Sequence, residues 1–503
     1  MNFISQRLTN RIRPVRRGWH RAAIALTVMA ALGATAPAMA GAAPPHPGSA
    51  GLGDPLFPLL GNGGYNVDHY DLSFNYDPAS RVFRATTVIE SRATQPLSRF
   101  DLDFAGNAVQ KVLIEGRPAG FVRTGEDLVV TPAHALRQNR QFRTTVIYTG
   151  TPAPYQGADP GGTKGFFPTV DGFFVAPQPQ AAHSVFPAND YPSDKATMTF
   201  HLTVPTGMTA VANGVLTSTE RHDGNVTWNW QEREPIATEL VTMAVGHYTI
   251  SRHAGPHGVA LRDVVPTADA NLAGLRTTLG QTASQMAWLE MRLGPYPFGT
   301  YGLLAVDANI GFAEEDQTLT VFRADWLAHG IPGFPAWEVT YGMAHELTHQ
   351  WFGDSVTPRH WSDAWLNEGP AVFYGTLYTA EHGGPSLASQ VRDAYAGDQQ
   401  LRDQYGPPAA PKSAATLYSD SIYSGGMLTL YALRGEVGPR TFDTIMRTWL
   451  ATYRHGTAST ADFIRTASAV SGQDLTSFLH GWLYGTRTPP LPGPHGPAAT
   501  RLR

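Results

Sequence analysis

Hydrophobic and polar residues alternate with a period of two through much of the first half of the chain. Such alternation is typical of half-buried antiparallel strands, and turn residues separate one run from the next. The pattern predicts a β-rich N-terminal domain over residues 65–254. The clearest runs cover residues 70–76, 142–148 and 198–204.

The periodicity becomes helical after about residue 255. Leucine and methionine recur at helical spacing up to Leu293, and Gly294-Pro295 then ends the stretch. A short strand is expected near residues 303–306, and most of the remaining chain is expected to be helical. Because 503 residues are too many for one compact core, we expect a second domain over residues 255–487.

The first forty residues have the features of a secretory signal peptide. An arginine-rich start precedes an apolar stretch over residues 22–34, which is too short to span a bilayer. Ala38-Met39-Ala40 fits a cleavage site, and Arg16-Arg17 resembles part of a twin-arginine export signal. We therefore expect residues 1–40 to be removed and the protein to be secreted or periplasmic, with a short membrane anchor as the alternative.

Regions rich in glycine or proline flank the two predicted domains. Residues 41–64 are predicted to be a flexible leader, and residues 488–503 a proline-rich tail. The chain has no cysteine, so disulfides do not contribute to its stability after export. A net charge of −4 gives no reason to expect a nucleic-acid partner, and no later segment indicates stable membrane insertion.

One motif concentrates the chemistry of the chain: His345-Glu346-Leu347-Thr348-His349, with Glu368 after eighteen intervening residues. Residues four apart on a helix share a face, so His345 and His349 can offer two imidazoles to one ion. Glu368 is the candidate third ligand, and the fourth position stays open for water or substrate, as a catalytic zinc requires. A structural zinc would need a fourth protein ligand, usually a cysteine. The motif therefore predicts one catalytic Zn²⁺ per chain.

Glu346 lies beside the two histidines and is the candidate general base. Zinc lowers the pKa of a bound water to about 7 and polarises a carbonyl group. A neighbouring carboxylate can take the proton and later pass it to a leaving amine. These groups together would hydrolyse an amide. Chance gives His-Glu-x-x-His in about 3 of 100 such chains, and with a glutamate at one given later spacing in about 1 of 1000.

Two flanking segments resemble a known family. They are Trp351-Phe352-Gly353-Asp354 and Trp365-Leu366-Asn367-Glu368-Gly369. Both resemble the aminopeptidase N family of gluzincin metallopeptidases, which includes leukotriene hydrolase, and the resemblance extends from about Tyr65 to about Pro490. It implies a multidomain α+β fold: an N-terminal antiparallel β-sandwich or saddle domain, then a thermolysin-like, mainly helical catalytic domain. The large C-terminal helical domain of longer members is not expected.

The same resemblance implies residues that bind the amino terminus of a substrate. Gly311-Phe312-Ala313-Glu314-Glu315 is similar to the family's Gly-Ala-Met-Glu-Asn segment, an edge strand that pairs with the substrate backbone. Gly311 and Glu314 are kept, so Glu314 takes the family role of binding the free amine. A carboxylate at the closed end of a cleft favours an ammonium group there, which makes the enzyme an exopeptidase.

Gln178 is the second candidate for the amine. It is located by counting back from residues 186–192, which are similar to the family's Phe-Pro-Cys-x-Asp-x-Pro stretch. Many members carry a second amine-binding glutamate at this place. A neutral amide accepts a hydrogen bond but adds no charge. We therefore expect weaker amine anchoring than in relatives with glutamate, and Gln178→Glu should lower the Michaelis constant.

Tyr423 is the candidate donor to the oxyanion. It lies in Ile422-Tyr423-Ser424-Gly425-Gly426, which is similar to the family's Tyr-x-Lys-Gly-Ala, with the lysine replaced by Gly425. A phenol aimed at charge that develops only in the transition state raises turnover. Pro370, two residues beyond the third ligand, is expected to kink its helix or to delay the helix start.

These features together predict an exported zinc aminopeptidase that removes N-terminal residues from peptides. A zinc endopeptidase or an epoxide hydrolase of the same family would use the same metal set, although Glu314 disfavours a chain that continues past the closed end. A non-catalytic binding protein on this scaffold is a further alternative. It would be expected to lose Glu346 or a metal ligand, and all of them are present.

Overall fold

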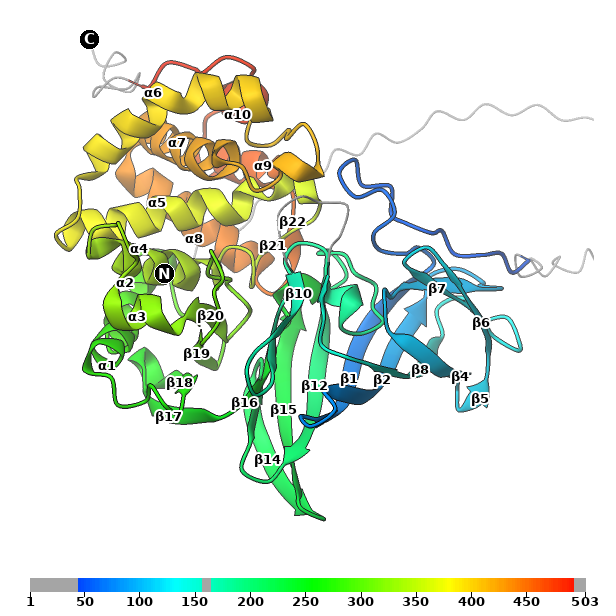
Figure 1. The fold of residues 1–503 in the computed structure, drawn as a ribbon. Coiled ribbons are helices and arrows are strands. Elements are labelled where there is room, and N and C mark those ends of the chain that lie inside the picture. Colours follow the sequence, from blue (N-terminus) through cyan, green and yellow to red (C-terminus); the bar gives the residue numbers. More distant parts are fainter. Residues whose placement is uncertain (1–43, 156–163, 493–503) are drawn as a thin grey trace, which may run out of the picture. The chain divides into compact units, whose positions relative to one another are not determined.

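The alternating runs of the first half form long paired strands in the computed structural model, which describes residues 44–155 and 164–492 (Figure 1). The predicted signal peptide over residues 1–40 lies outside the described residues, as do residues 493–503 of the predicted tail. The described chain has a β-rich part followed by a mainly helical part.

The longest strands build one sheet with the order β14-β15-β12-β1-β2-β8-β4-β5. Tyr70, Leu72 and Phe74 of β1 lie on one face and are all buried, as their spacing predicts. One neighbouring pair departs from the expected antiparallel arrangement, because β1 runs parallel to β12 with Tyr70 opposite Met198. The strands are β14 (Val215–His222), β15 (Asn225–Ile236), β12 (Ala196–Pro205), β1 (Tyr65–Asp77), β2 (Val82–Ala93), β8 (Gln141–Gly150), β4 (Ala108–Ile114) and β5 (Arg117–Pro118).

Two smaller sheets share a core with the large sheet. Buried aromatic rings from all three sheets meet in this core, among them Tyr148, Phe166 and Phe100. One small sheet has the order β13-β16-β11-β10-β9, and the other has the order β3-β7-β6. Their strands are β13 (Thr209–Ala212), β16 (Met243–Gly246), β11 (Phe173–Ala176), β10 (Lys164–Pro168), β9 (Pro154–Tyr155), β3 (Phe100–Asp103), β7 (Asp127–Thr131) and β6 (Gly120–Thr124).

A further sheet, with the order β17-β18-β19-β20, leads into the helical part. Its strands are β17 (Tyr248–Ala254), β18 (Ala260–Pro266), β19 (Thr300–Val306) and β20 (Thr320–Arg323). β17 pairs with β18 across the domain boundary that was predicted at residue 254. The predicted helical stretch up to Leu293 consists of two helices, α1 (Ala273–Leu279) and α2 (Thr282–Leu293), which are separated at Gly280.

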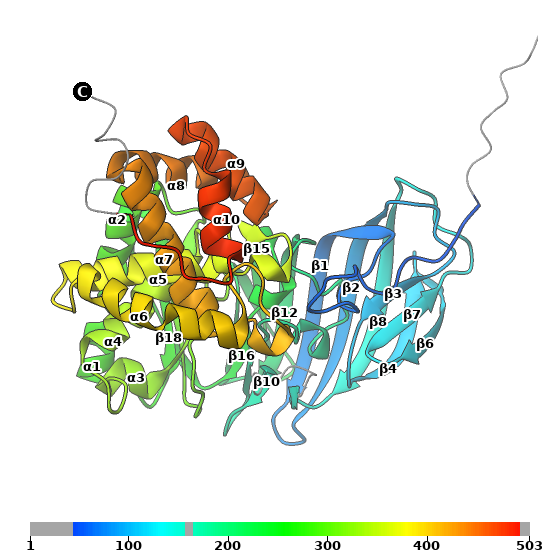
Figure 2. The same cartoon turned by 90° about the horizontal axis from the view of Figure 1, so that it is seen from above.

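The remaining helices gather at the end of the molecule opposite β2 and β8 (Figure 2). They are α3 (Ala324–His329), α4 (Trp337–His349), α5 (Trp365–Glu381), α6 (Leu387–Tyr405), α7 (Asp420–Val437), α8 (Pro439–Tyr453), α9 (Thr460–Ser471) and α10 (Thr476–Tyr484), and the short strands β21 (Thr357–Pro358) and β22 (Thr457–Ala458) pair among them. Within the described ranges, no helix is both long and apolar enough to cross a membrane.

Helices α5 and α7 cross with their backbones in contact at two glycines. A Cβ atom on Gly426 would lie 2.7 Å from Cα of Gly369, which is closer than carbon atoms normally approach. α5 begins at Trp365 and continues through Pro370, so the expected late helix start at this proline is wrong. Only the one hydrogen bond that an N–H at this position would make is lost, and the helix tolerates that loss.

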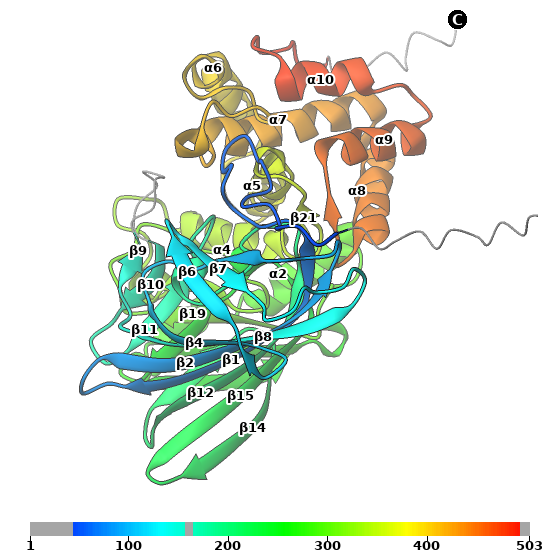
Figure 3. The ribbon, with the colours of Figure 1, turned by 90° about the vertical axis from the view of Figure 1, so that its right-hand side faces the viewer.

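Residues 44–64, here called the N-terminal strap, pack against both parts of the molecule (Figure 3). The strap makes backbone hydrogen bonds to the β-rich part, and the Asp54 carboxylate accepts a hydrogen bond from the Tyr191 hydroxyl at 2.6 Å. The ring of Phe57 lies 5.6 Å from that of Trp361 in the helical part. The composition of residues 41–64, on which the prediction of a flexible leader rests, does not reveal these buried contacts.

Candidate active site

Helices α4 and α5 bring the three predicted metal ligands together. Nε2 of His345 lies 3.1 Å from Nε2 of His349, and each nitrogen lies 3.4 Å from Oε2 of Glu368. The two histidines lie on the same face of α4 because they are about one helical turn apart. All three residues are at most 9% exposed, so packing holds their side chains in place.

The spacing of these three atoms fits a tetrahedral zinc ion. With bonds of about 2.0–2.1 Å to the metal, neighbouring ligand atoms at a tetrahedral centre lie about 3.3 Å apart. Oε2 of Glu368 is buried without a hydrogen-bond partner among the described residues, which suits an atom that binds a cation. Nδ1 of His349 lies 3.1 Å from the carbonyl oxygen of Phe352. This nitrogen donates to the carbonyl, which leaves Nε2 with a lone pair for the metal.

The charges around the three ligands also favour a cation. Burial acts to raise the pKa of Glu368, but His349 and His345 lower it to about 2, so the carboxylate is ionised. Burial acts to lower the pKa of His349, but Glu315 and Glu368 raise it well above its usual value. The same carboxylates that favour a proton on this imidazole would attract a metal ion.

Glu346 lies beside the ligands in the position of the predicted general base. One of its carboxylate oxygens lies within 4.8 Å of ligand atoms of both His345 and His349. Burial, followed by the charge of Glu315, raises the pKa of Glu346 well above its usual value. A raised pKa makes a carboxylate a better proton acceptor near neutral pH, which is the property that a general base needs.

Glu314 and Gln178 meet in a cleft of about 220 Å³. The backbone N–H of Gln178 donates to Oε1 of Glu314 at 3.2 Å. Glu314 also exchanges two backbone hydrogen bonds with Val321 of β20, so the segment lies along the edge of a sheet. Gly311 is not among the residues that line the cleft, whereas the two residues after it are.

Tyr423 lies in the first turn of α7 and lines the same cleft. Its ring is 6.3 Å from that of His345. Burial and the charge of Glu368 raise the pKa of Tyr423 well above its usual value, so the phenol keeps its proton and can donate it in a hydrogen bond. Tyr418 is a further cleft residue, which no sequence motif marks, and its ring lies 6.4 Å from that of Tyr423.

Glu315 is a second site residue that the sequence analysis did not assign. In the sequence it is only a departure from the asparagine of the family segment. In the structure its Oε1 accepts a hydrogen bond from Nε2 of Gln178 at 2.6 Å and lies 3.7 Å from Nδ1 of His349. The signal available in the sequence was a carboxylate at a position where the family has an amide, directly after Glu314, whose amine-binding role is predicted from the resemblance.

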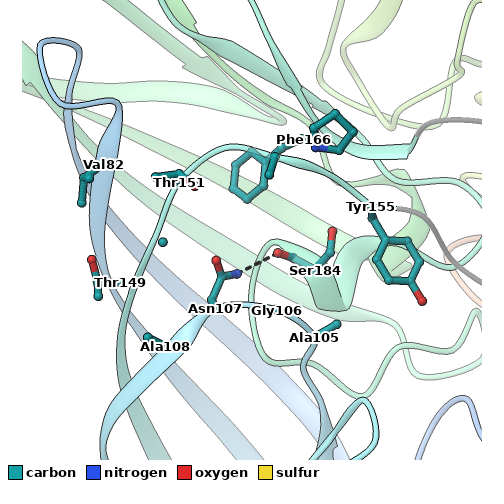
Figure 4. A pocket seen from close by; sticks show the side chains of 13 residues that line it. Val82, Ala105, Gly106, Asn107, Ala108, Thr149, Thr151, Tyr155, Phe166 and Ser184 are labelled. Atoms are coloured by element: carbon teal, nitrogen blue, oxygen red, sulfur yellow. Dashed lines mark hydrogen bonds between the residues drawn. The ribbon is translucent and has the colours of Figure 1, made fainter.

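A separate cavity of about 580 Å³ lies in the β-rich part (Figure 4). Asn107 lines it, and its Nδ2 donates to the carbonyl oxygen of Ser184 at 2.8 Å. None of the predicted site residues lines this cavity. Despite its volume, this cavity is therefore not a candidate site for the hydrolytic chemistry.

Comparison with known families agrees with both halves of the fold. The Peptidase M1 N-terminal domain matches residues 66–240, and the Peptidase family M1 domain matches residues 277–482. The second match contains the predicted metal ligands, Glu346 and Tyr423. The chain belongs to the M1 family of peptidases. The predicted family and the predicted fold class, a β-rich N-terminal domain before a mainly helical catalytic domain, are thereby confirmed.

Solved structures and curated relatives extend the M1 assignment. An M1 zinc metallopeptidase from Deinococcus radiodurans is 30% identical, with a TM-score of 0.78 and coverage of 89% of this chain and 99% of its own. A mutant M1 zinc metallopeptidase from the same organism, also 30% identical, was solved with a bound tripeptide substrate; the TM-score is 0.78, and 88% of this chain and all of that chain are covered. Together with the ligand geometry, these relatives confirm the predicted zinc cofactor.

Two curated relatives are longer than this M1 chain. Leukotriene A-4 hydrolase from Xenopus laevis is 26% identical over 63% of this chain and 53% of its own length. Aminopeptidase M1 from Arabidopsis thaliana is 25% identical over 61% of this chain and 36% of its own length. The chain thus spans about half or less of the length of these proteins.

Proposed function

We propose that this M1 peptidase is an exported zinc aminopeptidase that removes N-terminal residues from peptides with a free α-amine. The main support is the buried carboxylate of Glu314, which lines the same cleft as Tyr423. Such a carboxylate favours an ammonium group and resists a chain that continues past it. Support for export comes from the sequence of residues 1–40.

Each residue of the cleft has a distinct part in the proposed hydrolysis. Zinc supplies a Lewis acid that polarises the scissile carbonyl and lowers the pKa of water. Glu346 takes a proton from the attacking water and passes it to the leaving amine. Tyr423 donates a hydrogen bond to the developing oxyanion, while Glu314 and Gln178 hold the α-amine. The ion would be held by His345, His349 and Glu368.

Replacing the general base tests this assignment. Glu346→Gln should lower kcat on aminoacyl-fluorophore substrates by about 100- to 10,000-fold, because the proton of the attacking water loses its acceptor. Zinc content should stay unchanged, since Glu346 is not a ligand. Glu338→Gln removes a carboxylate from the first turn of the same helix and is the matched control, with activity expected near that of the unmodified protein.

The free amine separates the aminopeptidase from an endopeptidase. Acetylation of the substrate's α-amine removes the charge that Glu314 would bind, so almost all activity should be lost. Full activity on acetylated substrates would reject the aminopeptidase assignment and favour an endopeptidase. Equal activity of Glu346→Gln and the unmodified protein would reject hydrolysis by this site altogether.

A further inference from the structure

Glu315 connects the two ends of the active site that the proposed mechanism uses separately. Its Oε1 accepts a hydrogen bond from Nε2 of Gln178 at 2.6 Å and lies 3.7 Å from Nδ1 of His349. The Nε2 atom of His349, not Nδ1, is directed at His345 and Glu368. Glu315 therefore contacts the ring nitrogen of His349 that does not face the other two predicted ligands, and its carboxylate also lies within 4.8 Å of ligand atoms of His349 and Glu368.

The hydrogen bond from Gln178 determines which way its amide points. Nε2 of Gln178 donates to Oε1 of Glu315, so the NH₂ group of the amide faces Glu315. The amide oxygen then remains available as an acceptor, and Gln178 lines the cleft together with Glu314. If Glu315 were absent, the amide could turn over and present its NH₂ group to the ammonium group of a substrate, which would be repulsive.

Glu315 also adds negative charge to the amine-binding end. It follows Glu314 directly, and both residues are at most 4% exposed. Burial, followed by the charge of Glu315, raises the pKa of Glu314 well above its usual value, so the negative charge of Glu315 opposes the ionisation of Glu314. An incoming ammonium group would relieve this opposition. A neutral Gln178 therefore does not leave this end of the cleft with a single carboxylate.

We propose that Glu315 is a positioning residue for the substrate's α-amine, and that residues 178 and 315 form an exchangeable pair of one amide and one carboxylate. This inference rests on the proposed aminopeptidase function. It reverses the expectation for Gln178→Glu, because that change alone would place two carboxylates where a hydrogen bond of 2.6 Å now lies. Combining it with Glu315→Gln restores one amide and one carboxylate.

The experiment measures amine binding separately from metal binding. Inhibition constants are determined for leucine hydroxamate and for 4-methylpentanohydroxamate, which lacks the α-amine, with full-length, zinc-loaded protein. Both inhibitors bind the metal through the hydroxamate. The ratio of their two inhibition constants, here called the preference for the amine-bearing compound, therefore reports on the amine site. Glu315→Gln and Gln178→Glu should each lower this preference by about 10- to 100-fold, the loss expected for one contact to a charged group. The double variant should return it to within about threefold of the unmodified protein.

Two outcomes would overturn the proposal, and a third would instead overturn the proposed function. An unchanged preference in Glu315→Gln would overturn the proposed positioning role. If Glu315 only supported His349 structurally, the substitution would weaken the binding of both inhibitors equally and lower the zinc content. A double variant no better than Gln178→Glu alone would also overturn it, and this comparison still decides if Glu315→Gln does not fold. Failure of the proposed function looks different, since the unmodified protein would then bind both hydroxamates equally well.

Discussion

An alanine at position 426 tests whether the contact between α5 and α7 positions the active site. The added Cβ would lie 2.7 Å from Cα and 3.2 Å from the backbone nitrogen of Gly369. Carbon atoms in contact normally lie about 3.5–4.0 Å apart. Because both partners are backbone atoms, no side chain can rotate away, and the two helices must separate locally by about 1 Å.

This separation would act directly on two of the predicted site residues, Glu368 and Tyr423. Gly369 follows the third ligand, Glu368, and Gly426 lies three residues after Tyr423, so the tyrosine moves relative to the ligand. Overpacking lowers the free energy of unfolding by about 1–3 kcal/mol, whereas replacing a glycine within a helix by alanine raises it by up to about 1 kcal/mol. We expect Gly426→Ala to lower the free energy of unfolding by about 1–2 kcal/mol. We expect kcat to fall by about 10- to 100-fold, because a misplacement of about 1 Å is enough for such a loss.

Gly397→Ala is the matched control. Gly397 lies within α6, and no described heavy atom outside its own helical backbone lies within 4 Å of its Cβ position. This change should raise the free energy of unfolding by up to about 1 kcal/mol and leave kcat unchanged. Both variants are compared with the unmodified protein by urea unfolding and by turnover after zinc loading. If Gly426→Ala behaved like Gly397→Ala in both assays, the helix crossing would not constrain the site.

Two further predictions concern a side chain in the cleft and one on strand β18. Tyr423→Phe should lower kcat by about 100-fold with zinc content unchanged, as expected for the loss of one oxyanion donor; a fully active variant would move this role to another residue, such as Tyr418. Burial raises the pKa of Asp263 from a usual value of 3.8 to about 7. Between these two pH values the folded state binds more protons than the unfolded state. The free energy of unfolding therefore falls as the pH rises from about 4 to about 7. Asp263→Asn should reduce this fall in urea titrations at pH 5 and pH 8, and an unchanged difference between the two pH values would contradict the reasoning.

Features that depend on neighbours within one element could be predicted from the sequence. The alternation over residues 70–76 reflects one buried face of β1, which a period of two describes fully. His345 and His349 converge because a helix brings every fourth residue to the same face. In both cases the local backbone geometry alone decides where the side chains point.

Contacts between distant segments could not be predicted in this way. The hydrogen bond between Gln178 and Glu315 joins residues 137 positions apart, and that between Asp54 and Trp361 joins residues 307 positions apart. No periodicity links such partners, because their meeting depends on how whole sheets and helices pack. The family resemblance identified Gln178 as a candidate, but it did not reveal the bond to Glu315, since the family segment has asparagine there.

The eighteen-residue gap before Glu368 lies between these two cases. The chain leaves α4 at His349 and turns at Gly353, whose φ of 116° favours glycine. A Cβ on Gly353 would lie 3.1 Å from the amide carbon of Asn367, the residue before Glu368. The turn that follows the first two ligands therefore packs against the turn that carries the third. This contact between two turns is a physical link between the end of α4 and the position of the third predicted ligand on α5.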